Sequence, residues 1–181
     1  MSNTKNTSGT AASGIQLLTP THWKDYELID CGDFEKLERF GNLILIRPEP
    51  QAVWKKSLPE SEWTKVHHIR FKGRSATSGV WIKKNPKTPD RWHVSYKNND
   101  VEIKFRLGLT SFKHVGIFPE QAVNWDYISS CVKRFKTAEP KVLNLFSYTG
   151  GASLIARAAG ADTTHVDSVK QVVAWANENQ G

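Results

Sequence analysis

The sequence has only two cysteines, Cys31 and Cys131. Neither belongs to a C-x-x-C pair, which excludes a disulfide scaffold and a cysteine-ligated zinc site. Long hydrophobic runs are also absent, because no stretch approaches the ~18 apolar residues of a membrane span. The polar first fourteen residues contain no apolar segment of the kind that a secretory signal needs. These absences predict a protein without membrane contact in a reducing cytoplasm.

Charge is unevenly distributed over the 181 residues, which carry a net charge of +7. The segment from Lys55 to Lys113 holds fourteen Lys or Arg against five Asp or Glu, a net of +9, so the rest sums to −2. The stretch Asp25–Glu49 is acidic, with seven carboxylates against three basic residues. A basic module beside an acidic one predicts a polyanionic partner such as RNA, bound through residues 55–113. A lysine-rich face that is merely solvated is the alternative.

The first part of the chain has the pattern of a β protein. Residues 1–14 are rich in Ser, Thr, Asn and Gly and are predicted to be a disordered lead-in. Residues 15–110 are predicted to form a small, basic, mainly β domain, with a polar connection through Trp54 and Trp63. Short runs between turn residues predict its strands at 26–30, 36–40, 43–48, 66–71, 80–83, 91–96 and 101–107.

The pattern becomes helical after Thr110. Pro119 is a suitable first residue for a helix over 119–135, whose apolar face would contain Trp125, Ile128, Val132 and Phe135. A continuous apolar run then predicts a buried strand at 141–146, followed by a helix at 152–159, a strand at 162–167 and a helix at 168–179 that Ser168 would cap. Residues 111–181 are therefore predicted to begin a Rossmann-like parallel sheet, which gives an α/β fold after the β-rich domain.

The segment between these two strands carries the most chemical information. A turn with two glycines, Ser147–Gly151, joins the first strand to a helix, and the second strand ends in Asp167. Glycine allows close backbone approach, a helix N-terminus offers free N–H groups, and a carboxylate at this position accepts hydrogen bonds from ribose. The pattern predicts a nucleoside-containing cofactor, although it lacks the G-x-G-x-x-G that suits a dinucleotide. An ordinary turn whose glycines serve only packing is the alternative.

Three segments resemble a known family. The run VLNLFSYTGGAS at 142–153 resembles the first cofactor motif of class I S-adenosylmethionine-dependent methyltransferases, in the branch of the bacterial ribosomal RNA large-subunit methyltransferases. HVDS at 165–168 is similar to the family's ribose-binding segment, and FKHVGIFPEQ at 112–121 looks like the segment that leads into its catalytic domain. Residues 26–50 also resemble the amino-terminal β module of one branch.

The resemblance implies a cofactor, S-adenosylmethionine, and an RNA substrate, with ribosomal RNA the expected one. The residues themselves support only Gly150, Gly151 and Asp167 as contacts, and no catalytic residue is identified. The family adds a full set of expected cofactor-binding residues: Phe118, Gln121, Ser147, Tyr148, Thr149, Gly150, Gly151, Asp167 and Ser168.

One departure from the family pattern changes the expected activity. Family members continue to an Asp-Pro-Pro segment that positions the target base, and this sequence contains none. The chain is therefore expected to be the front part of a methyltransferase, inactive alone, with the carboxyl-terminal half supplied elsewhere. The alternatives are an RNA-binding β module with a vestigial catalytic tail and, less favoured, a nicotinamide-dependent oxidoreductase.

Other reactive or aromatic residues have simpler explanations. The adjacent His67 and His68 would point to opposite faces of a strand, which does not suit a shared metal ion. Cys131 lies on the 119–135 helix beside its apolar face, as expected of a buried or half-buried thiol rather than a nucleophile. The tryptophans at 54, 63, 81 and 92 lie among basic residues, where they would either stack RNA bases or pack a core.

Overall fold

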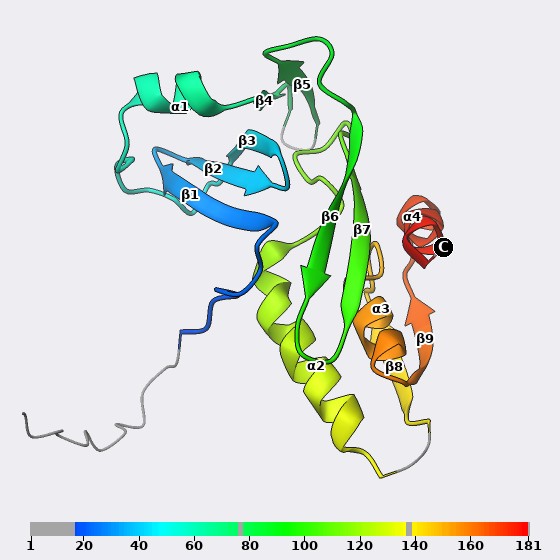
Figure 1. Cartoon of the computed structure of the whole chain (residues 1–181). Helices are drawn as coiled ribbons and strands as arrows, with labels where there is room; N and C mark the ends of the chain where they lie inside the picture. Colours follow the sequence, from blue (N-terminus) through cyan, green and yellow to red (C-terminus); the bar gives the residue numbers. More distant parts are fainter. Residues whose placement is uncertain (1–16, 76–77, 137–138, 181) are drawn as a thin grey trace, which may run out of the picture.

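The computed structural model describes residues 17–75, 78–136 and 139–180, so the predicted lead-in at 1–14 lies outside the described residues. A β-rich amino-terminal part precedes α/β units, which confirms the predicted fold class (Figure 1). The elements are β1 (Tyr26–Gly32), β2 (Glu35–Phe40), β3 (Leu43–Pro48), α1 (Glu60–Val66), β4 (Ile69–Gly73), β5 (Gly79–Lys83), β6 (Arg91–Lys97), β7 (Glu102–Gly108), the 3₁₀ turn η1 (Pro119–Gln121), α2 (Ala122–Arg134), β8 (Lys141–Leu145), α3 (Gly151–Ala158), β9 (Asp162–Val166) and α4 (Lys170–Gln180).

The first five strands form one sheet in the order β1-β2-β3-β4-β5. Its pairs are antiparallel except β3 and β4, which run parallel and are connected through α1. On one face of the sheet, Leu37, Ile46 and Trp63 form a small core from which water is excluded. The three side chains come from β2, β3 and α1, so this core fixes the helix on the sheet.

Helix α1 corrects the prediction of a polar connection through Trp63 and of a strand from residue 66. The helix has seven residues, only Trp63 is fully buried, and Glu60, Glu62 and Lys65 contribute charge. A helix with one buried side chain has no apolar periodicity, which is the signal that identifies helices in a sequence. Strand β4 consequently begins at Ile69, three residues later than predicted.

A buried carboxylate holds the loop before α1 against β1. Asp30 accepts hydrogen bonds from the backbone N–H groups of Cys31, Ser57 and Leu58 at 2.9, 3.2 and 2.9 Å, and from the indole of Trp63 at 2.9 Å. Burial disfavours its ionised form, but these donors outweigh burial and keep the pKa of Asp30 below its usual value. Asp30 is therefore a charged structural residue of the amino-terminal sheet.

The main core lies where the β6–β7 hairpin packs on α2 and α3. The ring of Trp125 on α2 contacts Trp23, Tyr96 and Phe105, with centroids 5.6, 5.0 and 5.3 Å apart. Residues from both sides of position 110 share this core, including Leu107 before it and Ile155 after it. Residues on both sides of the predicted domain boundary at 110 therefore belong to one continuous core.

The last unit is a two-stranded parallel sheet, β8 with β9, in the register Leu145 opposite Val166. The prediction that 141–146 is a buried strand is wrong, because four of these six residues are exposed and none is fully buried; Leu143 and Leu145 are 62% and 54% exposed. Phe135, predicted on the buried face of α2, is also 62% exposed. Among the described residues, no helix or strand covers the face of the β8–β9 sheet on which Leu143 and Leu145 lie.

None of the helices in the described part of the chain has the length and apolar character needed to cross a membrane.

Candidate functional site

The turn after β8 has a backbone that alternates between left-handed and ordinary conformations. Phe146, Tyr148 and Gly150 have φ values of 56, 52 and 93°. Such values are uncommon for residues with a side chain and cost of order 1–2 kcal/mol each, so other contacts must hold the turn. A succession of this kind exposes backbone N–H groups on one side of the loop, an arrangement that binds ligand oxygens.

Ser147 fixes the start of this turn to the end of β9. Its buried hydroxyl lies 2.6 Å from the carbonyl of Asn144 and 3.0 Å from that of Val166, and it accepts the Val166 N–H at 3.2 Å. Because the ends of β8 and β9 are joined in this way, the turn and the residue after Val166 lie side by side. Ser147 is fully engaged within the protein.

Asp167 fixes the middle of the turn. One carboxylate oxygen accepts the backbone N–H of Val169 at 2.9 Å and the other that of Tyr148 at 2.8 Å. These two amide donors hold the pKa of Asp167 below its usual value, so it is ionised at neutral pH. A carboxylate has about four acceptor positions, and two of them stay available for ligand hydroxyls.

Ser168 does not cap the last helix as predicted. The carbonyl of Val169 accepts the N–H groups of Val172 and Val173, which makes Val169 the residue before the first turn of α4. Asp167 accepts the Val169 amide, while Ser168 is exposed next to it. The carboxylate is the better acceptor for an orphan amide at a helix start, because its charge also complements the helix dipole.

The upstream segment 112–121 lies against the turn, as the resemblance implies. The rings of Phe118 and Tyr148 pack with centroids 4.8 Å apart, and the hydroxyl of Thr149 donates to the carbonyl of Gly116. Gly116 has a φ of 102°, and a Cβ there would overlap the ring of Trp175. Burial raises the pKa of Tyr148, which keeps its phenol neutral. The turn is thus held from both β9 and the segment before α2.

A cavity of about 330 Å³ lies in front of the turn, within the size range of small-molecule sites. Six of the nine sequence-predicted residues line it, and they come from η1, its preceding residue, the turn and the start of α3. These six are Phe118, Gln121, Ser147, Tyr148, Thr149 and Gly151. The sequence did not single out Ile117, Trp125, Asn144 and Phe146, which also line the cavity.

The other three predicted residues lie outside the cavity lining. Asp167 and Ser168 are at the end of β9, one hydrogen bond from Tyr148. Gly150 faces α4, where an added Cβ would lie 3.2 Å from that of Ala176, and a Cβ on Gly151 would lie 3.0 Å from the Trp125 ring. Both glycines therefore permit close packing of helices, and Gly150 also supplies the left-handed conformation.

This arrangement fits a nucleoside-containing ligand in its donors and acceptors. The first N–H groups of α3 have no partner within the helix, Asp167 offers a charged acceptor, and the cavity wall carries Phe118, Tyr148 and Trp125 as aromatic surfaces. Aromatic faces also suit a cationic group. In the described ranges, no group of three or more His, Cys, Asp or Glu is placed to hold a metal ion.

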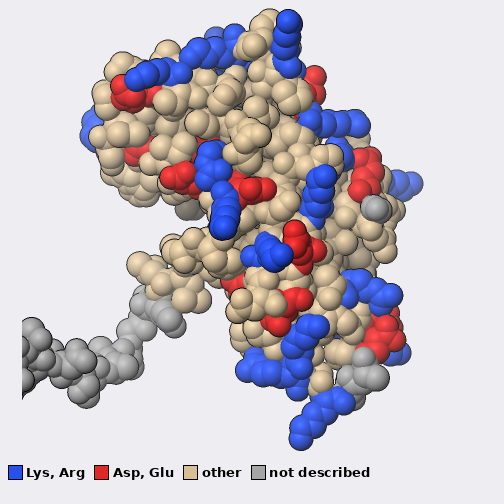
Figure 2. Space-filling model, viewed as in Figure 1, with Lys and Arg blue, Asp and Glu red and all other residues tan. Residues whose placement is uncertain are grey.

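The basic segment presents both paired and unpaired cations. Lys83 pairs with Asp90 at 2.8 Å and Lys97 with Glu102 at 2.7 Å. Figure 2 shows Lys and Arg side chains along the upper edge of the molecule, over α1 and the β4–β5 hairpin. Five exposed cations of the segment make neither an ion pair nor a side-chain hydrogen bond with another described residue: Lys72, Arg74, Lys87, Arg91 and Lys104.

Comparison with known proteins yields matches of sequence and of fold. No family model matches the chain. The ribosomal RNA large subunit methyltransferase K/L of Shewanella sp. strain ANA-3 is 31% identical over 138 residues, and that of strain W3-18-1 is 38% identical over the same length. Both alignments cover 72% of this chain and 18% of the relative. The chain therefore spans about a fifth of the length of these relatives.

Solved structures give the same family of folds. A SAM-dependent methyltransferase from Agrobacterium tumefaciens is 39% identical with a TM-score of 0.78, over 87% of this chain and 48% of that one. A methyltransferase complexed with SAH is 21% identical with a TM-score of 0.60 over 88% of this chain, a likeness of fold alone. These matches confirm the resemblance that the turn and its flanking segments predict.

Proposed function

We propose that this relative of the S-adenosylmethionine-dependent methyltransferases binds S-adenosylmethionine in the cavity before the turn 147–151 and contributes to methyl transfer to RNA. One observation carries the proposal: six predicted residues from two distant segments line a single cavity, and a hydrogen bond connects its wall to Asp167. The name of the Shewanella relatives supports ribosomal RNA as the substrate. Free Cys31 and Cys131 are consistent with the cytoplasm as the setting.

Each part of the site has a distinct task in this proposal. Asp167 accepts hydrogen bonds from the ribose hydroxyls, and the first amides of α3 bind ligand oxygens. Phe118 and Tyr148, fixed against each other, provide an apolar wall that excludes water, and Gln121 supplies an amide at its end. S-adenosylmethionine, when bound, supplies a methyl group on a positively charged sulfur. The protein side chains position this ligand, and none of them needs to react.

RNA binding through residues 55–113 is the second part of the proposal. The five cations without a partner among the described residues contribute to the excess positive charge of this segment. Each phosphate that they neutralise releases counterions, so affinity for a structured RNA should fall steeply with salt. A charge-reversing Lys72→Glu variant should flatten this dependence, whereas a salt-independent affinity would leave only the solvated-face interpretation. Retained RNA binding without cofactor binding would favour the alternative of an RNA-binding module.

Equilibrium dialysis of the 181-residue chain with radiolabelled S-adenosylmethionine tests the cofactor site. Asp167→Ala removes the acceptor for the ribose hydroxyls and should weaken binding by about tenfold or more. Asp162→Ala is the matched control, because Asp162 is an exposed carboxylate at the opposite end of the same strand. Equal affinities for the two variants would contradict the ribose-binding role of Asp167.

A further inference from the structure

A second, larger cavity of about 950 Å³ opens beside the candidate site. The N-terminal segment 18–24, strands β1 and β2, the loop 49–54 and η1 contribute its lining. In Figure 2 this region is hollowed between the upper sheet and the N-terminal segment. Its volume is at the upper end of the range for small-molecule sites, which leaves room for more than one compact group.

The two cavities share a wall. Pro119 and Glu120 line the larger one, whereas Phe118 and Gln121, the residues on either side, line the smaller one. The ring of Trp23 in the larger cavity also contacts the ring of Trp125 in the smaller one, with centroids 5.6 Å apart. A chain-like ligand that occupied both cavities would therefore have η1 between its two bound parts.

The lining presents flat apolar surface to solvent. Trp54 is 54% exposed and Leu28 is 49% exposed, although most large apolar side chains of this sheet are buried. The indole N–H of Trp54 donates to the carbonyl of Cys31 at 2.9 Å, which fixes the orientation of the ring. A fixed, exposed aromatic ring loses little conformational entropy when a planar group stacks on it.

The charges of the lining balance one another. Arg39 is 3.2 Å from Glu27, and Lys36 is 3.3 Å from Glu49, so these cations are already paired. The other two charged lining residues, Lys24 and Glu120, have opposite signs. Such a surface offers little attraction to a phosphate backbone, whose binding depends on excess cations. It suits unpaired bases, which bind by stacking and by hydrogen bonds.

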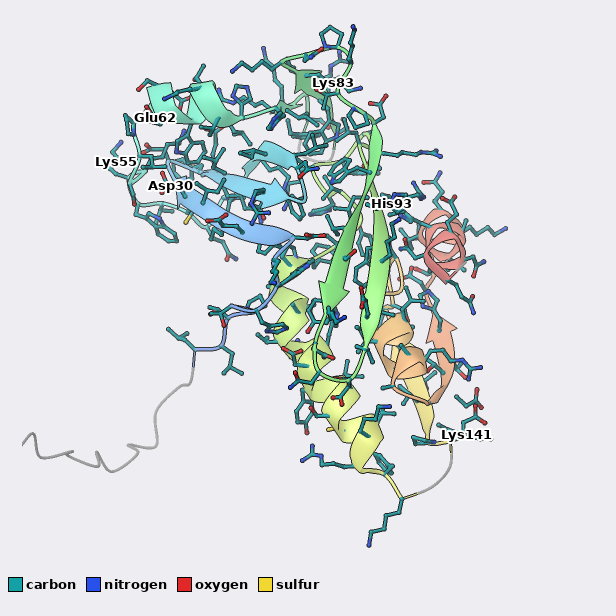
Figure 3. The ribbon with its side chains drawn as sticks, in the orientation of Figure 1. Asp30, Lys55, Glu62, Lys83, His93 and Lys141 are labelled. Atoms are coloured by element: carbon teal, nitrogen blue, oxygen red, sulfur yellow. The ribbon has the colours of Figure 1, made fainter. Side chains whose placement is uncertain are left out.

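An exposed cation lies next to Trp54 in the chain instead. Lys55 follows Trp54 directly, and its side chain is 92% exposed (Figure 3). Its neighbour Asp33, at 3.0 Å, is itself 40% exposed, so this pair is weakly held and open to competition from phosphate. These charges favour an RNA segment that places its bases inside the cavity and its phosphates outside it.

We propose that the larger cavity binds unpaired bases of a single-stranded RNA segment next to the nucleotide at the candidate site, and that Trp54 stacks on one of them. The inference rests on the proposed function, since it assigns the substrate a path into that site. It differs from binding through the 55–113 surface, because stacking contributes affinity that salt does not screen.

Fluorescence anisotropy with a labelled single-stranded 12-nucleotide RNA and the 181-residue chain tests this path. Trp54→Ala should weaken binding by about tenfold, the scale of one lost base–aromatic stack, without changing the salt dependence. Trp54→Phe should restore most of the affinity. Tyr127→Ala is the control, because Tyr127 is 67% exposed on α2 and does not line the cavity.

The outcomes separate this inference from the proposed function. Three outcomes would each overturn the proposed RNA path. They are equal RNA affinities for Trp54→Ala and Tyr127→Ala, an equal loss of affinity for a fully duplex RNA in Trp54→Ala, and no binding of single-stranded RNA by the unaltered chain. Dialysis with S-adenosylmethionine should give the same affinity for Trp54→Ala and the unaltered chain. If Trp54→Ala weakens RNA binding while neither this variant nor the unaltered chain binds S-adenosylmethionine, the RNA path stands and the proposed cofactor site fails. Should Trp54→Ala not fold, Trp54→Leu removes the aromatic face while keeping an apolar side chain, and it should weaken binding to the same extent.

Discussion

Leu45 in β3 and Leu143 in β8 are the same residue type near the middle of a strand, yet Leu45 is fully buried and Leu143 is 62% exposed. β3 has a neighbouring strand on each side and a core on its face, whereas β8 pairs only with β9 and has one uncovered face in the described structure. The difference shows that an apolar strand sequence specifies pairing, while a second layer decides burial.

Alanine substitutions at these two leucines should give the largest difference between the regions. Leu45→Ala leaves a cavity in a closed core and should lower the free energy of unfolding by about 2–5 kcal/mol. Leu143→Ala removes a mostly exposed side chain and should change it by no more than about 0.5 kcal/mol. Urea titrations followed by circular dichroism measure both. Similar losses would mean that the β8 face is covered in solution.

Asp30→Asn compares the same two regions through a buried polar group instead of an apolar one. The amide has one acceptor oxygen where the carboxylate has two, so its NH₂ group would face two donors, either those of Leu58 and Trp63 or those of Cys31 and Ser57. We expect a loss of about 1–3 kcal/mol in the free energy of unfolding, the cost of unpaired buried donors. Asp162→Asn, at an exposed position in β9, is the control and should be nearly neutral. A neutral Asp30→Asn would remove the structural role of this carboxylate.

Amide hydrogen exchange compares the regions without mutation. The N–H groups of β2 and β3 lie inside a five-stranded sheet and should exchange slowly, through global unfolding. Those of β8 and β9 have one neighbouring strand each and should open locally, with exchange faster by about tenfold or more. Mass spectrometry of peptides from 35–48 and 141–166 distinguishes the two. Equal protection would show that one cooperative unit includes both sheets.

Acid should produce the smallest effect, which we consider at His68, next to β4 of the amino-terminal sheet. The Nδ1 atom of His68 accepts the Ile44 N–H at 3.0 Å, so the ring is neutral there. Burial, with the charges of His67 and Lys84, lowers the pKa of His68. Since the folded state holds the proton less well than the unfolded state, stability is complete above about pH 6.5 and declines as pH falls below it. Thermal melts of His68→Gln should show a flatter decline between pH 7 and 5, whereas exposed His93→Gln should follow the unaltered chain.

The sequence predicted most elements of the fold because their signals are local. Short runs bounded by turn residues around Leu37 and Leu45, and the turn at 97–100 between two alternating runs, identified strands within a few residues. The missed helix α1 has no periodicity, since one side chain, Trp63, holds it. The apolar run around Leu143 by itself predicts burial, whereas its exposure follows from the expectation that this sequence supplies only two strands of a parallel sheet and leaves one of their faces open.

The candidate site was predictable to the extent that its residues follow one another in the chain. Ser147, Tyr148 and Thr149 occupy a single turn, and the family resemblance led to them. Trp125 also lines the cavity, from α2, but the sequence of the turn does not indicate this. Its position in the sequence predicts only one more residue on the apolar face of a helix. Phe118 came from the resemblance alone, and its contact with Tyr148 is a tertiary one.

The aromatic cluster around Trp125 limits how this protein can be dissected. A shortened chain that stopped at residue 110 would keep Trp23, Tyr96 and Phe105 but lose the indole on which their rings pack. The exposed rings would form an apolar patch of the kind that drives aggregation. Fragments that retain α2 keep the Trp125 indole against these rings, but only those that also include α3 keep the side of Trp125 that faces Gly151 covered.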